Sequence, residues 1–164
     1  MKKKISIILP SLENGGAERL HIYLANSWVE LGFDVTVAIL HNKTNLKKFL
    51  NNKINLKILN VKKIKYSLIP LTIFFLNNKP DIIVTAMWPL TSITILSKLI
   101  SFTKSKLITV DHCPYANLYS SHLKINKPLL FKIINFTYKF AFKNIVVSQK
   151  IKKEFEKFTK LNTN

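Results

Sequence analysis

The 164-residue chain is long enough for one domain with its own hydrophobic core but not for two, and its 48% hydrophobic content is typical of a globular protein. A net charge of +18 favours anionic partners, whether nucleic acid, lipid headgroups or phosphorylated metabolites. The single Cys113 excludes an internal disulfide, and the apolar run before Pro10 is too short for a signal peptide core, so we expect a cytoplasmic protein.

Apolar residues recur along the chain in alternating strand and helix patterns. In chain order they predict a strand over 5–9, a helix over 17–31, a strand over 34–40, a short helix over 45–51, a strand over 55–60, a helix over 67–78, a strand over 81–85, a helix over 90–101, a strand over 106–110, a helix over 128–142, a strand over 144–148 and a basic helix from residue 150. This alternation predicts an α/β fold, a Rossmann-like doubly wound parallel sheet with helices on both faces. We expect one domain spanning residues 1–164.

The first predicted helix, over 17–31, is amphipathic and ends at Gly32. Its apolar positions recur three and four residues apart, at Leu20, Leu24, Ala25, Trp28 and Leu31. We expect these residues to face the sheet.

Ligands of doubly wound sheets bind in the crevice beyond the carboxyl ends of the strands. The candidate site therefore lies in the loops that follow Leu9, Thr85, Val110 and Ser148.

The loop after the first strand contains Gly15 and Gly16 at the start of a helix. Residues without a Cβ let backbone amides approach a phosphate, and the helix dipole favours its negative charge. The alternative is that the two glycines only form the tight turn into the helix. Their spacing differs from the GxGxxG pattern of dinucleotide-binding proteins.

Arg19 is the one arginine in a chain with 25 lysines, and it lies in the first turn of the same helix. Its planar guanidinium can bind a phosphate or carboxylate through two hydrogen bonds, as a lysine cannot. The alternative is an ordinary ion pair with Glu18 or another nearby acid.

The segment that runs from Pro10 to Arg19 and ends in Gly15-Gly16-Ala17-Glu18-Arg19 resembles the start of the family 4 retaining glycosyltransferases. Further segments are similar to this family along nearly the whole chain, namely 21–25, 31–37, 79–83, Asp111-His112, and 144–148 with 150–155. Phe33 stands where histidine is commoner in the family.

The resemblance implies the N-terminal, acceptor-side half of a two-domain GT-B fold that transfers sugar from a nucleotide-sugar donor, without a metal or other cofactor. It implies that Gly15, Gly16 and Arg19 face the donor diphosphate and that His112 lies near the reacting sugar as the catalytic residue. Candidate acceptor-binding residues are Asn14, Trp88 and Asp111. The donor-binding half has no counterpart in these 164 residues, so we expect the isolated chain to lack activity.

Other interpretations of single segments are weaker. The uncharged stretch 82–97 is shorter than the roughly 20 residues of a membrane-spanning helix, and Pro89 interrupts it. His112, Cys113 and His122 suggest a metal site, but no second ligand pair at metal-binding spacing supports it. Aromatic residues over 131–142 suit base stacking, yet their helical spacing favours core packing.

Two other functions are compatible with the sequence. If the chain is not half of a transferase, one alternative is a noncatalytic basic module that binds polyanions. The other is a nonfunctional remnant of a longer enzyme. Scattered lysines argue against a specific nucleic-acid partner. If the acceptor is a glycan on a lipid carrier, as in the synthesis of surface polysaccharides or glycoconjugates, the Lys-rich apolar segments 62–76 and 115–142 would rest on the inner, anionic face of a membrane.

Overall fold

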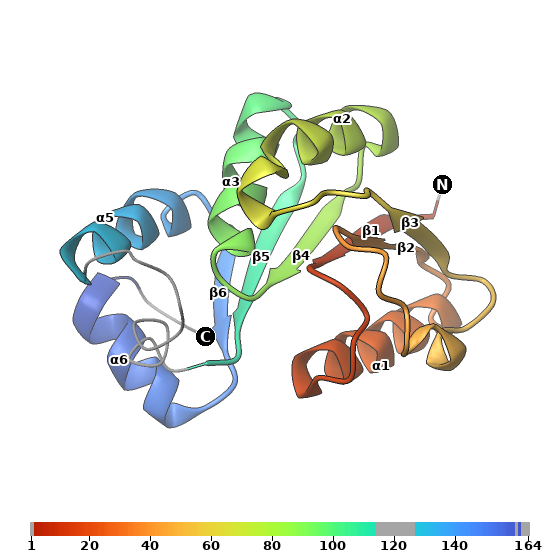
Figure 1. The fold of residues 1–164 in the computed structure, drawn as a ribbon, viewed down its shortest axis with the longest axis horizontal. Coiled ribbons are helices and arrows are strands. Elements are labelled where there is room, and N and C mark those ends of the chain that lie inside the picture. The colour runs from red at the N-terminus through yellow and green to blue at the C-terminus, as the bar shows by residue number, and fades with distance from the viewer. Residues whose placement is uncertain (1, 114–126, 160, 162–164) are drawn as a thin grey trace.

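The computed structural model describes residues 2–113, 127–159 and 161. It shows a parallel six-stranded sheet with helices on both faces (Figure 1). The elements are β1 (Lys4–Leu9), α1 (Gly16–Glu30), β2 (Asp34–Ile39), the 3-10 turn η1 (Lys47–Phe49), β3 (Asn55–Ile58), the 3-10 turn η2 (Ile64–Tyr66), α2 (Leu68–Asn78), β4 (Ile82–Ala86), α3 (Leu90–Ile100), β5 (Lys106–Asp111), α5 (Lys127–Tyr138), β6 (Lys143–Val146) and α6 (Gln149–Thr159).

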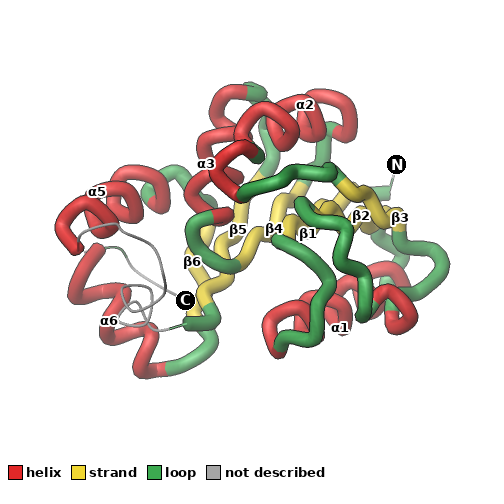
Figure 2. Tube along the Cα trace, viewed as in Figure 1, coloured by secondary structure: helices red, strands yellow, loops and turns green. Residues whose placement is uncertain are grey.

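The strand order in the sheet is β3-β2-β1-β4-β5-β6, and each neighbouring pair is parallel (Figure 2). β1 lies at the centre, where Ile5 is in register with Val35 on one side and Ile82 on the other. The strand order reverses at β1, so β1 and β4 form the switch point where ligands of such sheets bind. The doubly wound parallel fold predicted from the sequence is confirmed.

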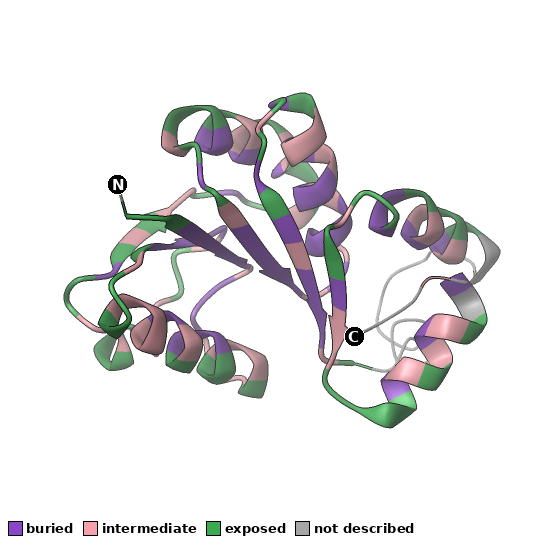
Figure 3. Cartoon of the chain, turned by 180° about the vertical axis from the view of Figure 1, so that it is seen from behind, coloured by how far each residue is buried: buried purple, intermediate pink, exposed green. Residues whose placement is uncertain are grey.

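Two hydrophobic clusters fill the two faces of the sheet, and burial is greatest along the strands (Figure 3). The larger cluster joins side chains of α2, α3, α5 and α6, with Phe75 and Tyr138 fully buried in it. The other cluster joins one face of the strands with Ile22 and Ala25 of α1. Among the described residues, α1 is the only α-helix whose buried side chains enter this second cluster.

The side of α1 that faces the sheet agrees with the prediction at Ala25 and Trp28 but not at Leu20 and Leu31. Leu20 and Leu31 are exposed, at 39% and 74%, whereas His21, Ile22 and Ala25 are buried. The buried stripe therefore starts one residue later than the leucine pattern indicates. His21 can lie in this stripe because its Nδ1 donates within the helix to the carbonyl oxygen of Ala17, although its Nε2 has no hydrogen-bond partner among the described residues.

Two predicted helices are shorter than expected. The segment 45–51 forms only the turn Lys47–Phe49, and the Leu46 amide donates to the carbonyl of Leu12 in the loop after β1. α5 ends at Tyr138, because Phe142 donates its amide to the carbonyl of Leu107 and the chain joins the sheet there. The stretch 82–97 divides into β4 and α3, and no helix in the described ranges is long and apolar enough to cross a bilayer.

Candidate functional site

The loop between β1 and α1 leaves the sheet at the switch point. Backbone hydrogen bonds join it to the loop after β2, with the Leu12 amide donating to the Lys43 carbonyl over 2.8 Å. Asn14 is exposed in this loop, Gly15 precedes α1 in extended conformation, and Gly16 is the first helical residue. The glycine pair therefore starts a helix at the carboxyl edge of the sheet, as the sequence predicts.

Gly16 is not required by the packing of the chain. A Cβ placed on it would meet no described atom within 4 Å, and its φ lies outside the left-handed region that favours glycine. The space beside the first turn of α1 is open, and backbone amides point into it from the helix start. A bare backbone at this position therefore suits an external group that approaches closely.

Gly15 has a local neighbour instead. A Cβ on Gly15 would collide with the carboxylate of Glu18, which folds back from the first turn of α1. A carboxylate at this place is favoured by the positive end of the helix dipole. An anionic ligand at the helix start would consequently meet the charge of Glu18.

Arg19 is exposed, and its guanidinium carbon lies 5.8 Å from the ring centroid of Phe49. The guanidinium thus stacks over an aromatic ring of the η1 segment. The ion pairs found within the described ranges do not include one between Arg19 and Glu18.

His112, directly after β5, contacts a second histidine. The ring centroids of His21 and His112 are 5.3 Å apart, in an edge-to-face arrangement. Since the Ala17 carbonyl can only accept, Nδ1 of His21 carries the proton and Nε2 presents a lone pair. Nε2 of each histidine is buried without a hydrogen-bond partner among the described residues. The contact places the N-terminal half of α1 against the end of β5, and two unsatisfied ring nitrogens remain there.

Burial lowers the pKa of both histidines. Loss of solvation is the larger cause and the neighbouring His21 the smaller one, and together they lower the pKa of His112 to about 4. Burial also lowers the pKa of His21, although its hydrogen bond to Ala17 acts in the opposite direction. Both rings are therefore neutral at pH 7, which suits them to hydrogen bonds with hydroxyl groups.

The low histidine pKa values predict a loss of stability in acid. Because the folded pKa lies below the unfolded value, the unfolded chain binds more protons between pH 6.5 and about 4. The stabilisation is complete above pH 6.5 and disappears as the pH falls to 4. Urea unfolding midpoints measured from pH 7 to 4 should fall more in the wild type than in His112→Gln.

Histidine ring signals in NMR titrations give a direct check of this prediction. The His112 pKa should be near 4 in the wild type and should rise in His21→Gln while staying below 6.5, because burial is the larger cause. A His112 ring that titrates near 6.5 in the folded wild type would contradict the structure.

The loop after β4 has an unusual backbone at the switch point. Met87 has a φ of 68°, in the left-handed region, and the Trp88-Pro89 peptide bond is cis. The Trp88 ring is turned into the larger hydrophobic cluster and is 9% exposed. Its indole Nε1 is buried without a hydrogen-bond partner among the described residues. Trp88 thus offers at most an indole N–H to a ligand, and the ring face is already packed.

Asp111 takes part in a buried polar network. The Tyr138 hydroxyl donates to Asp111 Oδ1 over 3.1 Å and lies 2.7 Å from the Thr91 hydroxyl. Asp111 is 4% exposed, so its side chain ties the end of β5 to α5 and α3. The network fixes the backbone from which His112 projects.

The proposed metal cluster lies partly outside the described residues, since His122 belongs to the segment 114–126. Cys113 is exposed. Within residues 2–113, 127–159 and 161, no three His, Cys, Asp or Glu side chains are grouped so that they could hold a metal ion.

The sequence model of Glycosyltransferase Family 4 matches residues 14–162, which start at the glycine loop and include every element from α1 to α6. The chain belongs to glycosyltransferase family 4. Among curated proteins, no sequence matches the chain significantly.

Solved structures show the same fold for this family 4 chain. Sucrose-phosphate synthase from Thermosynechococcus elongatus has a TM-score of 0.70 and 11% identity, over 99% of this chain and 47% of that one. The lipopolysaccharide outer core galactosyltransferase WaaB has a TM-score of 0.66 and 14% identity, over 94% of this chain and 42% of that one. The family 4 chain therefore spans less than half the length of these two transferases, with the fold of an N-terminal GT-B domain.

The fold is also shared more widely. A short-chain dehydrogenase/reductase from Veillonella parvula has a TM-score of 0.54 and 9% identity, over 89% of the family 4 chain and 69% of its own. Such a similarity concerns the doubly wound sheet alone.

The structure places the predicted site residues Asn14, Gly15, Gly16, Trp88, Asp111 and His112 at the carboxyl edge of the family 4 domain, with the side chains of Trp88 and Asp111 buried there. His21, which contacts His112, was not predicted as a site residue, although it lies only five residues after Gly16. The apolar pattern of α1 does not place His21 toward the sheet, so only the packing of α1 beside the end of β5 identifies it.

Proposed function

We propose that this chain is the acceptor-side half of a glycosyltransferase that transfers sugar from a nucleotide-sugar donor to a glycan or lipid-linked acceptor. Membership in family 4 supports a glycosyltransferase role. The reaction would contribute to the synthesis of cell-surface polysaccharide or glycoconjugates at the cytoplasmic face of a membrane. The domain that binds most of the nucleotide would be supplied by sequence outside these residues, in the same protein or in a separate chain.

The observation that carries the proposal is the open space at Gly16. Neither packing nor backbone conformation accounts for a glycine there, and the neighbouring helix start favours an anion. The donor diphosphate has the charge and the oxygen acceptors for this position. In the proposal, the Glu18 carboxylate moves away from Gly15 when the diphosphate binds, and Arg19 gives additional positive charge along the same helix.

The histidine pair supports the other end of the proposed site. A sugar hydroxyl can donate to an unprotonated ring nitrogen and accept from a protonated one, so it can provide the missing partner of the partly exposed His112. His112 would bind or orient the reacting sugar, with His21 behind it. Asn14, Trp88 and Asp111 would border the acceptor.

Titration of the isotopically labelled chain tests the proposal. Nucleoside diphosphate sugars and inorganic pyrophosphate should shift the backbone amide signals of residues 15–19, and only the sugar-bearing ligands should also shift the ring signals of His112. Single-stranded DNA at two salt concentrations serves as the comparison. If only DNA binds, with a steep loss of affinity as salt rises, the basic polyanion-binding module is correct instead.

A further inference from the structure

Helix α2 carries apolar side chains on its outer side as well as on its inner side. Leu71, Phe74 and Phe75 are buried against the sheet and α3. Ile69, Ile73 and Leu76 occur four and three residues apart and are 69%, 52% and 49% exposed. Residues at this spacing share one face of a helix, so α2 presents an apolar stripe to solvent.

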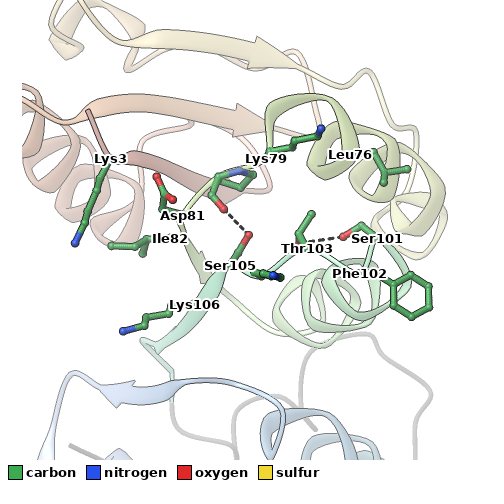
Figure 4. A pocket seen from close by; sticks show the side chains of 12 residues that line it. Lys3, Leu76, Lys79, Asp81, Ile82, Ser101, Phe102, Thr103, Ser105 and Lys106 are labelled. Carbon is green, nitrogen blue, oxygen red and sulfur yellow. Dashed lines mark hydrogen bonds between the residues drawn. The ribbon is translucent and has the colours of Figure 1, made fainter. Parts of the chain in front are cut away.

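The stripe continues at the end of α3. Phe102, in the turn after α3, is 91% exposed, and Ile100 is 52% exposed. Leu76 and Phe102 line the same cavity, of about 570 Å³ (Figure 4). Large exposed apolar groups that adjoin one another mark an interaction surface, since folding leaves them in water at a cost. We name Ile69, Ile73, Leu76, Ile100 and Phe102 the α2 face.

Lysines border the α2 face. The cavity beside Leu76 and Phe102 is also lined by Lys3, Lys79, Lys104 and Lys106, with Lys3 and Lys106 on the side opposite Phe102 (Figure 4). Its one acid, Asp81, accepts the backbone amide of Lys4. Residues 61–106 contain this single acid against seven lysines, at positions 62, 63, 65, 79, 98, 104 and 106.

The cavity lies at the amino edge of the sheet, where β1, β4 and β5 begin, and so at the opposite end from the glycine loop. In the chain α2 connects β3 to β4, and it runs from the carboxyl edge of the sheet back to the amino edge. Lys62, Lys63, Lys65 and Tyr66, which is 60% exposed, precede it at the carboxyl edge. The α2 face and its lysines thus extend from the amino edge to the edge that bears the candidate site.

We propose that the α2 face docks on a bilayer containing anionic lipid. Its isoleucine, leucine and phenylalanine side chains enter the interfacial region, and the surrounding lysines contact lipid phosphates. The charge of this surface is complementary to an anionic membrane. A nucleic acid would leave the aliphatic stripe without a partner. The functional role of this docking rests on the proposed function. Docking would bring the candidate site to the bilayer surface, where a lipid-linked acceptor resides.

Co-sedimentation of the full 164-residue chain with vesicles tests the docking without any nucleotide sugar, so its outcome is independent of the transferase proposal. Binding to phosphatidylcholine vesicles with 30% phosphatidylglycerol is expected, with much weaker binding to phosphatidylcholine alone and a decrease from 50 mM to 300 mM salt. Phe102→Asn is expected to weaken binding about tenfold, since a phenylalanine leaves the interface. Asparagine suits the left-handed φ of 50° at this residue.

Matched variants test whether vesicle binding depends on the α2 face or only on the overall charge and hydrophobicity of the chain. Leu31→Gln removes a 74% exposed apolar side chain at the end of α1 and should leave vesicle binding unchanged. Lys104→Gln should weaken binding roughly fivefold, whereas Lys53→Gln, next to β3, should not. Equal recovery with neutral and anionic vesicles, or equal losses in the α2-face and control variants, would overturn the proposal. Binding of the wild type to a protein partner with no vesicle binding would overturn it as well.

Discussion

Gly16→Val is expected to remove binding of the donor diphosphate while leaving the domain folded. A Cβ at residue 16 would meet no described atom within 4 Å outside its own helical turn, so the free energy of unfolding should change by less than about 1 kcal/mol. A ligand that approaches the bare helix start would collide with the added methyl groups. We expect at least a hundredfold loss of affinity for a nucleoside diphosphate sugar, measured by calorimetry on the complete enzyme, with thermal unfolding followed in parallel.

Two further glycine variants control this experiment. Gly16→Ala should give an intermediate loss of affinity and slightly higher stability, because alanine favours helix more than glycine does. Gly32 has a φ of 89°, so Gly32→Ala should destabilise the domain by about 1–2 kcal/mol without weakening nucleotide binding. If Gly16→Val binds the nucleoside diphosphate sugar with unchanged affinity, the proposed position of the diphosphate at the helix start is wrong.

His112→Ala is expected to lower kcat of the complete enzyme by roughly 10²–10³-fold, the usual effect of removing one hydrogen-bonding group that acts on the transition state. KM should change less, since the diphosphate contacts remain. The measurement is steady-state sugar transfer, with folding verified by circular dichroism.

His41→Gln provides the matched control for His112. The ring Nδ1 of His41 lies 2.7 Å from the Val61 carbonyl oxygen, which gives it a structural partner. Its replacement should lower stability and leave kcat within a few-fold of wild type. Full turnover in His112→Ala would show that this histidine does not act on the sugar.

The sequence predicts the sheet well because its strands are short apolar runs bounded by Gly, Pro, Asn or Lys. It also places the glycine loop correctly, since chain order alone puts that loop after β1 and before α1. Contacts between distant segments are harder to predict. Nothing local to His21 indicates the ring of His112, because the two meet only when α1 packs beside the end of β5.

Two other features could not be read from local patterns. Trp88 follows a strand, and the sequence does not show that its ring is buried in the core after the reversed backbone at Met87. In α2 apolar residues occur on all sides, so periodicity cannot tell which side the sheet covers. Packing against the sheet and α3 determines that Ile69, Ile73 and Leu76 remain outside.

The two faces of the sheet are covered unequally, and this affects how binding at the start of α1 would reach the histidine pair. α1 lies on its face of the sheet without another described α-helix in the same cluster, whereas the helices of the opposite face brace one another. The glycine pair at the start of α1 and His21, about one turn later, are held by the same helix. If a bound diphosphate displaced the start of α1, the His21 ring would move relative to the His112 ring. Binding at the helix start would then affect the part of the site beside His112.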